Sequence, residues 1–105
     1  MATQAVKQGI EIEQERRQIV EEMVAENGPN WLNEYKPGSF GCHELLDRTA
    51  QAAEALERTV LSHPACALNQ EWYLLAEQAV NALRELYQRI GEDHLGKQEK
   101  ETGAG

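Results

Sequence analysis

The sequence predicts an all-α fold, a small antiparallel three-helix bundle, and two observations predict it. Apolar residues recur at steps of three and four over most of the 105 residues, which is the period of amphipathic helices. Glycine and proline mark the breaks between three long helical segments. The length suits a single domain with one core. We therefore expect residues 1–91 to form one bundle domain and residues 92–105 to form a flexible polar tail.

The first helix is expected over residues 3–26. It should end at Asn27 and Gly28, which suit a left-handed cap, because Pro29 cannot continue the helical hydrogen bonds. Its middle, the stretch "EQERRQ" at residues 13–18, is much less apolar than its ends. We expect this middle either to turn away from the core or to pair its charges with another helix or another chain.

Residues 28–41 are expected to form a connector, because they contain two prolines and three glycines. A short helical turn over residues 29–35 would fit within it. The connector is rich in aromatic residues, so we expect it to cover one end of the helices. The residues expected to pack there are Trp31, Leu32, Tyr35 and Phe40.

The second helix is expected over residues 42–62, because His63 precedes a proline and such residues leave the helical region. Its core positions alternate at steps of four and three, as in a helix packed at a shallow angle. They are Cys42, Leu46, Thr49, Ala53, Leu56 and Val60.

A single helical turn is expected from Pro64, and the third long helix over residues 70–90, with Asn69 as its cap and Gly91 as its stop. In the tail that follows, His94 and Leu95 lie near enough to fold back on the bundle end. The predicted core stripe of the third helix is Trp72, Ala76, Ala79, Leu83, Leu86 and Ile90.

The composition argues against several kinds of partner. The formal net charge is −8, from 18 acidic and 10 basic residues, so the long-range field repels nucleic-acid backbones and acidic membrane surfaces. No apolar run approaches the roughly 20 residues that span a bilayer, and the N-terminal stretch lacks the core of a signal peptide. We therefore expect a cytoplasmic protein with its two cysteines reduced and no membrane or nucleic-acid partner.

Residues able to do chemistry crowd together in one stretch, "GSFGCHELLDR". The structural interpretation is a helix start, in which Ser39 or Gly41 caps the helix and the acidic side chains of Glu44 and Asp47 lie where the helix dipole favours negative charge. Cys42 then points into the core as a small buried hydrophobe. The alternative is a reactive thiolate, because a thiol beside a protonated histidine at a helix N-terminus has a lowered pKa.

A metal site is the second hypothesis for this stretch. His43 and Asp47, four residues apart, share a helix face, and helical bundles hold metals with carboxylates and histidines from facing helices. If the second and third helices are antiparallel about a turn near residue 66, His43 lies near Arg89 and Asp47 near Glu85, and His94 comes within reach. The candidate ligands are therefore His43, Asp47 and Glu85, completed by a glutamate of the first helix, with a divalent transition metal as cofactor.

The function predicted from the sequence is that of a non-enzymatic helical interaction protein, an adaptor or regulator that binds another protein or a copy of itself. Phosphate-loop, dinucleotide, serine-hydrolase and zinc-protease motifs are absent from the sequence, so an enzyme is the less favoured class. A homodimer is expected, since a small bundle often completes its core with a second copy. The alternative is the metal-binding or metal-dependent bundle described above.

Overall fold

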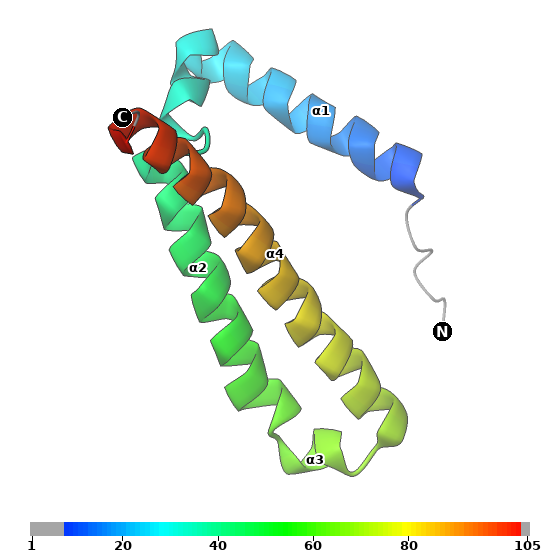
Figure 1. The fold of residues 1–105 in the computed structure, drawn as a ribbon. Helices are drawn as coiled ribbons and strands as arrows, with labels where there is room; N and C mark the ends of the chain where they lie inside the picture. Colours follow the sequence, from blue (N-terminus) through cyan, green and yellow to red (C-terminus); the bar gives the residue numbers. More distant parts are fainter. Residues whose placement is uncertain (1–7, 104–105) are drawn as a thin grey trace. The chain divides into compact units, whose positions relative to one another are not determined.

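The structure is a computed structural model that describes the backbone of residues 8–103 and the side chains of residues 8–96. Within that range every segment of regular structure is helical (Figure 1), so the predicted all-α class is confirmed. The chain divides into two compact units, residues 1–33 and 34–105, which are described separately. The predicted positions 3–7 and 104–105 lie outside the described residues.

The first unit holds helix α1, Gly9–Asn27, and most of a 3-10 helix, Pro29–Glu34. Helix α1 ends as predicted: Gly28 has φ 85°, and its N–H donates to the Val24 carbonyl at 2.8 Å. The Asn27 side chain also donates to the carbonyl of Met23. Two local capping bonds and a left-handed glycine therefore set this helix boundary.

The polar middle of α1 is an ion cluster centred on one carboxylate. Glu13 accepts hydrogen bonds from Arg16 Nε at 2.9 Å and Arg17 Nε at 3.0 Å. The two arginines lower the pKa of Glu13 to about 2, chiefly through the hydrogen bond from Arg16. The cluster therefore stays charged and well solvated on the helix surface.

The second unit begins with a tight turn and helix α2, Phe40–Leu56. Gly38 takes a φ of 91°, and the Ser39 hydroxyl accepts from the Cys42 N–H at 3.2 Å, so Ser39 is the cap. Four of the six predicted core positions of this helix are buried, and Leu56 is half-buried. The buried four are Cys42, Leu46, Thr49 and Ala53.

The end of this helix departs from regular α geometry. Residues Glu57–Leu61 form a π-helical turn, closed by the Ser62 N–H donating to the Glu57 carbonyl at 3.0 Å. The wider turn rotates the helix face, so the predicted core position Val60 is 42% exposed. The predicted stop before Pro64 is nevertheless confirmed.

Helix α3, Pro64–Ala67, is the single turn predicted from its leading proline. His63 caps it, since Nδ1 of the ring accepts from the Ala65 N–H at 3.0 Å. Asn69 then caps helix α4 by accepting from the Trp72 N–H at 3.0 Å. The connection between the two long helices is thus held by side-chain caps at both ends.

Helix α4 covers Gln70–Gly103, so the predicted helix end at Gly91 is wrong. Gly91 does not adopt a positive φ; among the described residues only Gly28 and Gly38 do. It lies where α4 approaches α2, and a Cβ built there would meet Leu46 Cδ1 at 3.8 Å. The predicted mobility of residues 92–105 stays a prediction.

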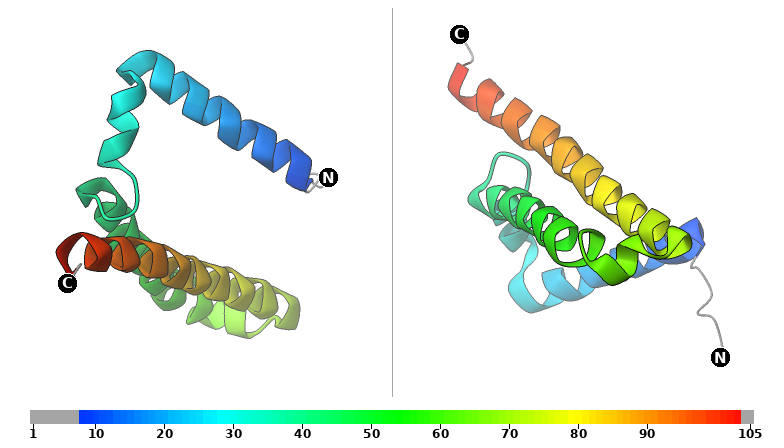
Figure 2. Two further views of the ribbon diagram at one scale, coloured as in Figure 1. Left: turned by 45° about the horizontal axis from the view of Figure 1, so that its top comes forward. Right: turned by 90° about the horizontal axis from the view of Figure 1, so that it is seen from below.

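Helices α2 and α4 lie side by side in the views of Figures 1 and 2 and run in opposite directions. Three contacts establish this: Gly38 with His94, Leu46 with Gly91, and Glu57 with Arg84. The three-helix arrangement, with α1 as the third member, stays a prediction.

The register of this helix pair differs from the predicted one. His43 lies beside His94, five positions beyond the Arg89 that a turn near residue 66 would place there. Helix α3 lies between α2 and α4 in the chain and contacts both α4 and the π-helical turn after α2. The partners of His43 and Leu46 both lie five positions further along α4 than a turn at residue 66 would place them.

The position of Gly91 inside a helix generates a prediction. Replacing it by alanine should raise the free energy of unfolding by about 0.5–1 kcal/mol, because alanine loses less backbone entropy in a helix and its Cβ has room. Chemical denaturation followed by circular dichroism measures this. Gly41→Ala is the matched control and should destabilise, since its Cβ would collide with the Glu34 carbonyl and the Tyr35 ring. A loss of stability in Gly91→Ala would mean that the helix ends there.

Candidate functional site

His94 is fully buried, with 0% of its surface exposed, although it follows the predicted helix end. Its Nδ1 accepts a hydrogen bond of 2.8 Å from the Gly38 N–H, which joins α4 to the turn before α2. Because Nδ1 is the acceptor, we assign the proton of the neutral ring to Nε2. The imidazole therefore links two segments that are 56 residues apart in the chain.

The second nitrogen of this ring stands in a different environment. Among the residues whose side chains are described, no hydrogen-bond partner is found for the buried Nε2. The exposed ring of His43 lies nearby, with centroids 5.6 Å apart and planes tilted by 43°. The structure thus brings together one histidine from each helix at this end of the pair.

Cys42 is buried beside the same turn. Burial is the main cause that raises the pKa of its thiol; the Gly38 N–H opposes this, and the nearby Asp93 carboxylate adds to it. Both cysteines are free and buried. This environment favours the neutral thiol and supports the structural interpretation of the helix start.

The predicted metal ligands enter other interactions. Asp47 accepts from the Gln51 side chain at 3.0 Å, and Glu85 pairs with Arg89 at 3.4 Å on an exposed helix surface. In the part of the chain that is described, no group of three or more histidine, cysteine, aspartate or glutamate side chains is arranged to hold a metal ion. The site of His43, Asp47 and Glu85 stays a prediction.

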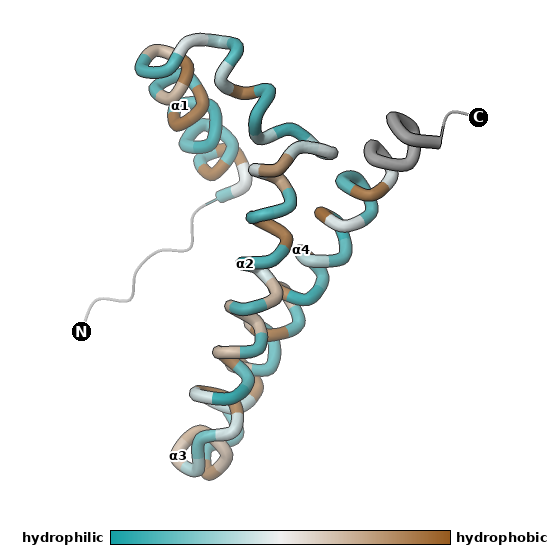
Figure 3. The backbone as a smooth tube through the Cα atoms, turned by 90° about the vertical axis from the view of Figure 1, so that its left-hand side faces the viewer, coloured by the Kyte–Doolittle hydropathy of each residue, from teal (hydrophilic) through white to brown (hydrophobic). Residues whose placement is uncertain are grey.

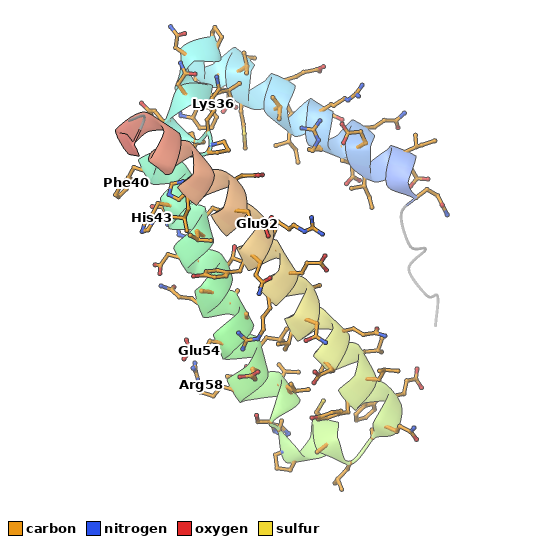
Figure 4. The ribbon with its side chains drawn as sticks, in the orientation of Figure 1. Lys36, Phe40, His43, Glu54, Arg58 and Glu92 are labelled. Carbon is orange, nitrogen blue, oxygen red and sulfur yellow. The ribbon has the colours of Figure 1, made fainter. Side chains whose placement is uncertain are left out.

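A shallow hollow of about 390 Å³ lies at the start of α2. Phe40 borders it and is 84% exposed, so the prediction that this ring covers the helix ends is wrong. Figure 4 shows Phe40 and Arg58 on the side of α2 turned away from α4, and Glu92 on the side of α4 turned away from α2. The residues lining the hollow are Glu34, Tyr35, Ser39, Phe40, Gly41 and Glu44.

One side of the helix pair is apolar and exposed. Because 3.6 residues make a turn, α4 carries two stripes about 100° apart. The first faces α2 through Ala76, Val80 and His94, which are buried. The second is exposed, and beside it on α2 lie Leu45 and Ala52. We call these residues the apolar face: Leu45, Ala52, Trp72, Leu75, Ala79, Ala82 and Leu86.

The exposed fractions on this face are high for large apolar side chains: 57% for Trp72, 57% for Leu75 and 45% for Leu86. The opposite side of the pair carries the ion pair between Glu57 and Arg84 and the contact of the two histidines. In Figure 3, brown and teal alternate along both helices, as expected for amphipathic segments. Exposed apolar side chains of both helices therefore gather on the apolar face, while Tyr73, Leu74 and Tyr87 of α4 are exposed outside it.

The predicted core stripe of the third helix was partly wrong, because it assigned Trp72, Ala79 and Leu86 to the core and these residues are exposed. That stripe lies between the two stripes observed. The sequence does contain a signal for the second stripe, because the apolar positions of α4 cover a wider arc of the helix than one neighbouring helix can bury.

No protein-family model, curated protein or solved structure matches this chain. Between residues 8 and 103, no helix combines the length and the apolar character needed to cross a bilayer.

The burial of His94 generates a prediction. His94→Ala should lower the free energy of unfolding by about 2–3 kcal/mol, because it removes a buried ring and leaves the Gly38 N–H without its acceptor. His43→Ala, which removes the exposed ring opposite, should change stability by less than about 0.5 kcal/mol. Urea denaturation of both variants measures this. Equal effects of the two substitutions would contradict the assigned role of His94.

Cys42 provides a chemical test. With a raised pKa and little exposure, its thiol should react with iodoacetamide at neutral pH as slowly as that of buried Cys66. Peptide mass spectrometry over a time course gives the two rates, and in urea both should become fast. Labelling of Cys42 well ahead of Cys66 in the folded protein would instead support a reactive thiolate.

Proposed function

We propose that this chain is a non-enzymatic helical interaction protein that associates with a copy of itself or with another protein through the apolar face. The observation that carries the proposal is the exposure of Trp72, Leu75 and Leu86 on one side of α4. Large contiguous apolar patches are uncommon on monomeric proteins and mark interaction sites. The proposal assigns an adaptor or regulatory role.

The bundle that we propose is built on the antiparallel pair of α2 and α4. The apolar face of this pair is left for a second copy or another protein, and the predicted packing of α1 as a third helix of the same bundle stays a prediction. The small buried residues Ala53 and Ala76 support close packing of α2 and α4. In a self-associating protein, two protomers would form a six-helix assembly.

The chemistry of the histidine end supports an interaction protein over an enzyme. Burial raises the pKa of the Cys42 thiol, which favours its neutral form, and His94 uses Nδ1 in a structural hydrogen bond. Asp47 and Glu85 are engaged with neighbours on their own helices. Cys42, His94, Asp47 and Glu85 thus each have a structural environment or interaction that accounts for them.

Sedimentation velocity over a concentration series tests this proposal. We expect the average mass to rise towards that of a dimer between low and high micromolar concentrations, because the apolar face becomes buried. Added sodium chloride should strengthen the association, since each copy carries a net charge of −8 and salt screens their repulsion. A single monomeric species throughout, with no binding of the apolar dye ANS, would contradict the proposal.

A further inference from the structure

We infer that the apolar face is the contact between two copies of this chain, with α4 of one copy antiparallel to α4 of the other. This inference rests on the proposed function and adds to it the partner, the direction and the residue pairs. It follows from the order of side-chain sizes along the exposed stripe of α4, from the charge at one end of that stripe, and from the area of the face.

The exposed stripe matches itself when reversed. It places two alanines at its centre, Ala79 and Ala82, with Leu75 before them and Leu86 after them. Steps of three and four give it the spacing of a coiled-coil seam. In an antiparallel pair about the midpoint of the alanines, Ala79 of one copy meets Ala82 of the other, and Leu75 meets Leu86. Small residues then meet in the middle and leucines meet on either side, which lets two backbones approach closely.

The ends of the stripe are also complementary. The same register sets Trp72, 57% exposed, opposite Arg89 of the second copy. A guanidinium over an indole face is a favourable cation–π contact. Arg89 already lies on the exposed surface, where it pairs with Glu85 at 3.4 Å. A symmetric dimer makes this contact twice, once at each end.

The area of the face suits a dimer of moderate affinity. From Trp72 to Arg89 the stripe is about 25 Å long at 1.5 Å per residue, and two helices side by side are about 20 Å wide. The projected face is thus on the order of 500 Å², somewhat below the roughly 800 Å² that each partner buries in a standard interface. Leu45 and Ala52 of α2 contribute to it, which makes the contact one between helix pairs.

The alternative occupant is α1 of the same chain, whose apolar positions Ile12, Ile19 and Met23 are exposed. Arg16 interrupts this stripe halfway, and it is bound with Arg17 to the ionised Glu13. Packing that cluster onto the alanine centre of α4 would remove paired charges from water, which is costly. The second copy presents a matching apolar surface with no charge at its centre.

Two charged substitutions test the pairing. Leu75→Lys and Leu86→Glu each put a charge into both leucine layers of the symmetric dimer, so each should raise the dissociation constant of the dimer by about 100-fold. Mixed in equal amounts, the two variants should form a mixed dimer whose dissociation constant lies within about 10-fold of that of the unchanged protein. In the mixed dimer one layer joins lysine to glutamate and the other keeps its two leucines. Sedimentation velocity measures all of these states.

The matched control is Leu74→Lys. Leu74 is 56% exposed but lies off the apolar face, so this variant should associate like the unchanged protein. Circular dichroism spectra should be alike in all three variants, because each replaced side chain is about half exposed in the single copy.

The other results separate the two proposals. If the unchanged protein dimerises but Leu75→Lys and Leu86→Glu dimerise equally well, the face is wrong and self-association stands. If both variants fail to associate and their mixture also fails, the antiparallel register is wrong. If the unchanged protein is monomeric and Leu75→Lys unfolds more easily than Leu74→Lys, α1 covers the face and the dimer is overturned.

Discussion

The contact between α2 and α4 is the constraint on which the rest of the second unit depends. The side chains buried along it are small or medium in size, chiefly Cys42, Leu46, Ala53, Ala76 and Val80. Small side chains bring the two helix axes close, and the close approach leaves no room for more. Two helices share only one seam, so the large apolar side chains of α4 must lie outside it. The exposed tryptophan and leucines therefore follow from the tightness of the contact.

The same contact explains why a histidine is buried at the end of the pair. Beyond Gly91, α4 still lies beside the turn that leads into α2, and the Gly38 N–H of that turn donates to His94. This bond stabilises the continued helix, because a buried N–H without an acceptor costs about 1–3 kcal/mol. This hydrogen bond thus helps to explain why α4 continues past Gly91, where the local sequence predicts a helix end.

Periodicity and capping residues were sufficient to predict the helices and most of their boundaries, as at Ser39, Pro64, Asn69 and Gly28. These signals are local, so one sequence contains them in full. The end of α4 could not be predicted in this way. Judged from its neighbours in the sequence, Gly91 is typical of a helix end, but in the folded pair it lies where α4 approaches α2. The register of α2 against α4 was also predicted wrongly, since it depends on the path of the chain between them, which includes α3. For the same reason His43 was expected beside Arg89 and lies beside His94.

The distribution of charge supports recognition through the apolar face. The net charge of −8 repels anionic partners at long range, yet it is carried by side chains that lie mostly away from that face. Charge repulsion between copies, which salt screens, slows non-specific association. A short-range apolar contact stabilises a complex only when the two surfaces match in shape. On the other side of the helix pair, the exposed ion pair between Glu57 and Arg84 is already formed within one copy and would add little to binding. In the proposed dimer, affinity and selectivity would therefore both come from the order of large and small side chains along one helix.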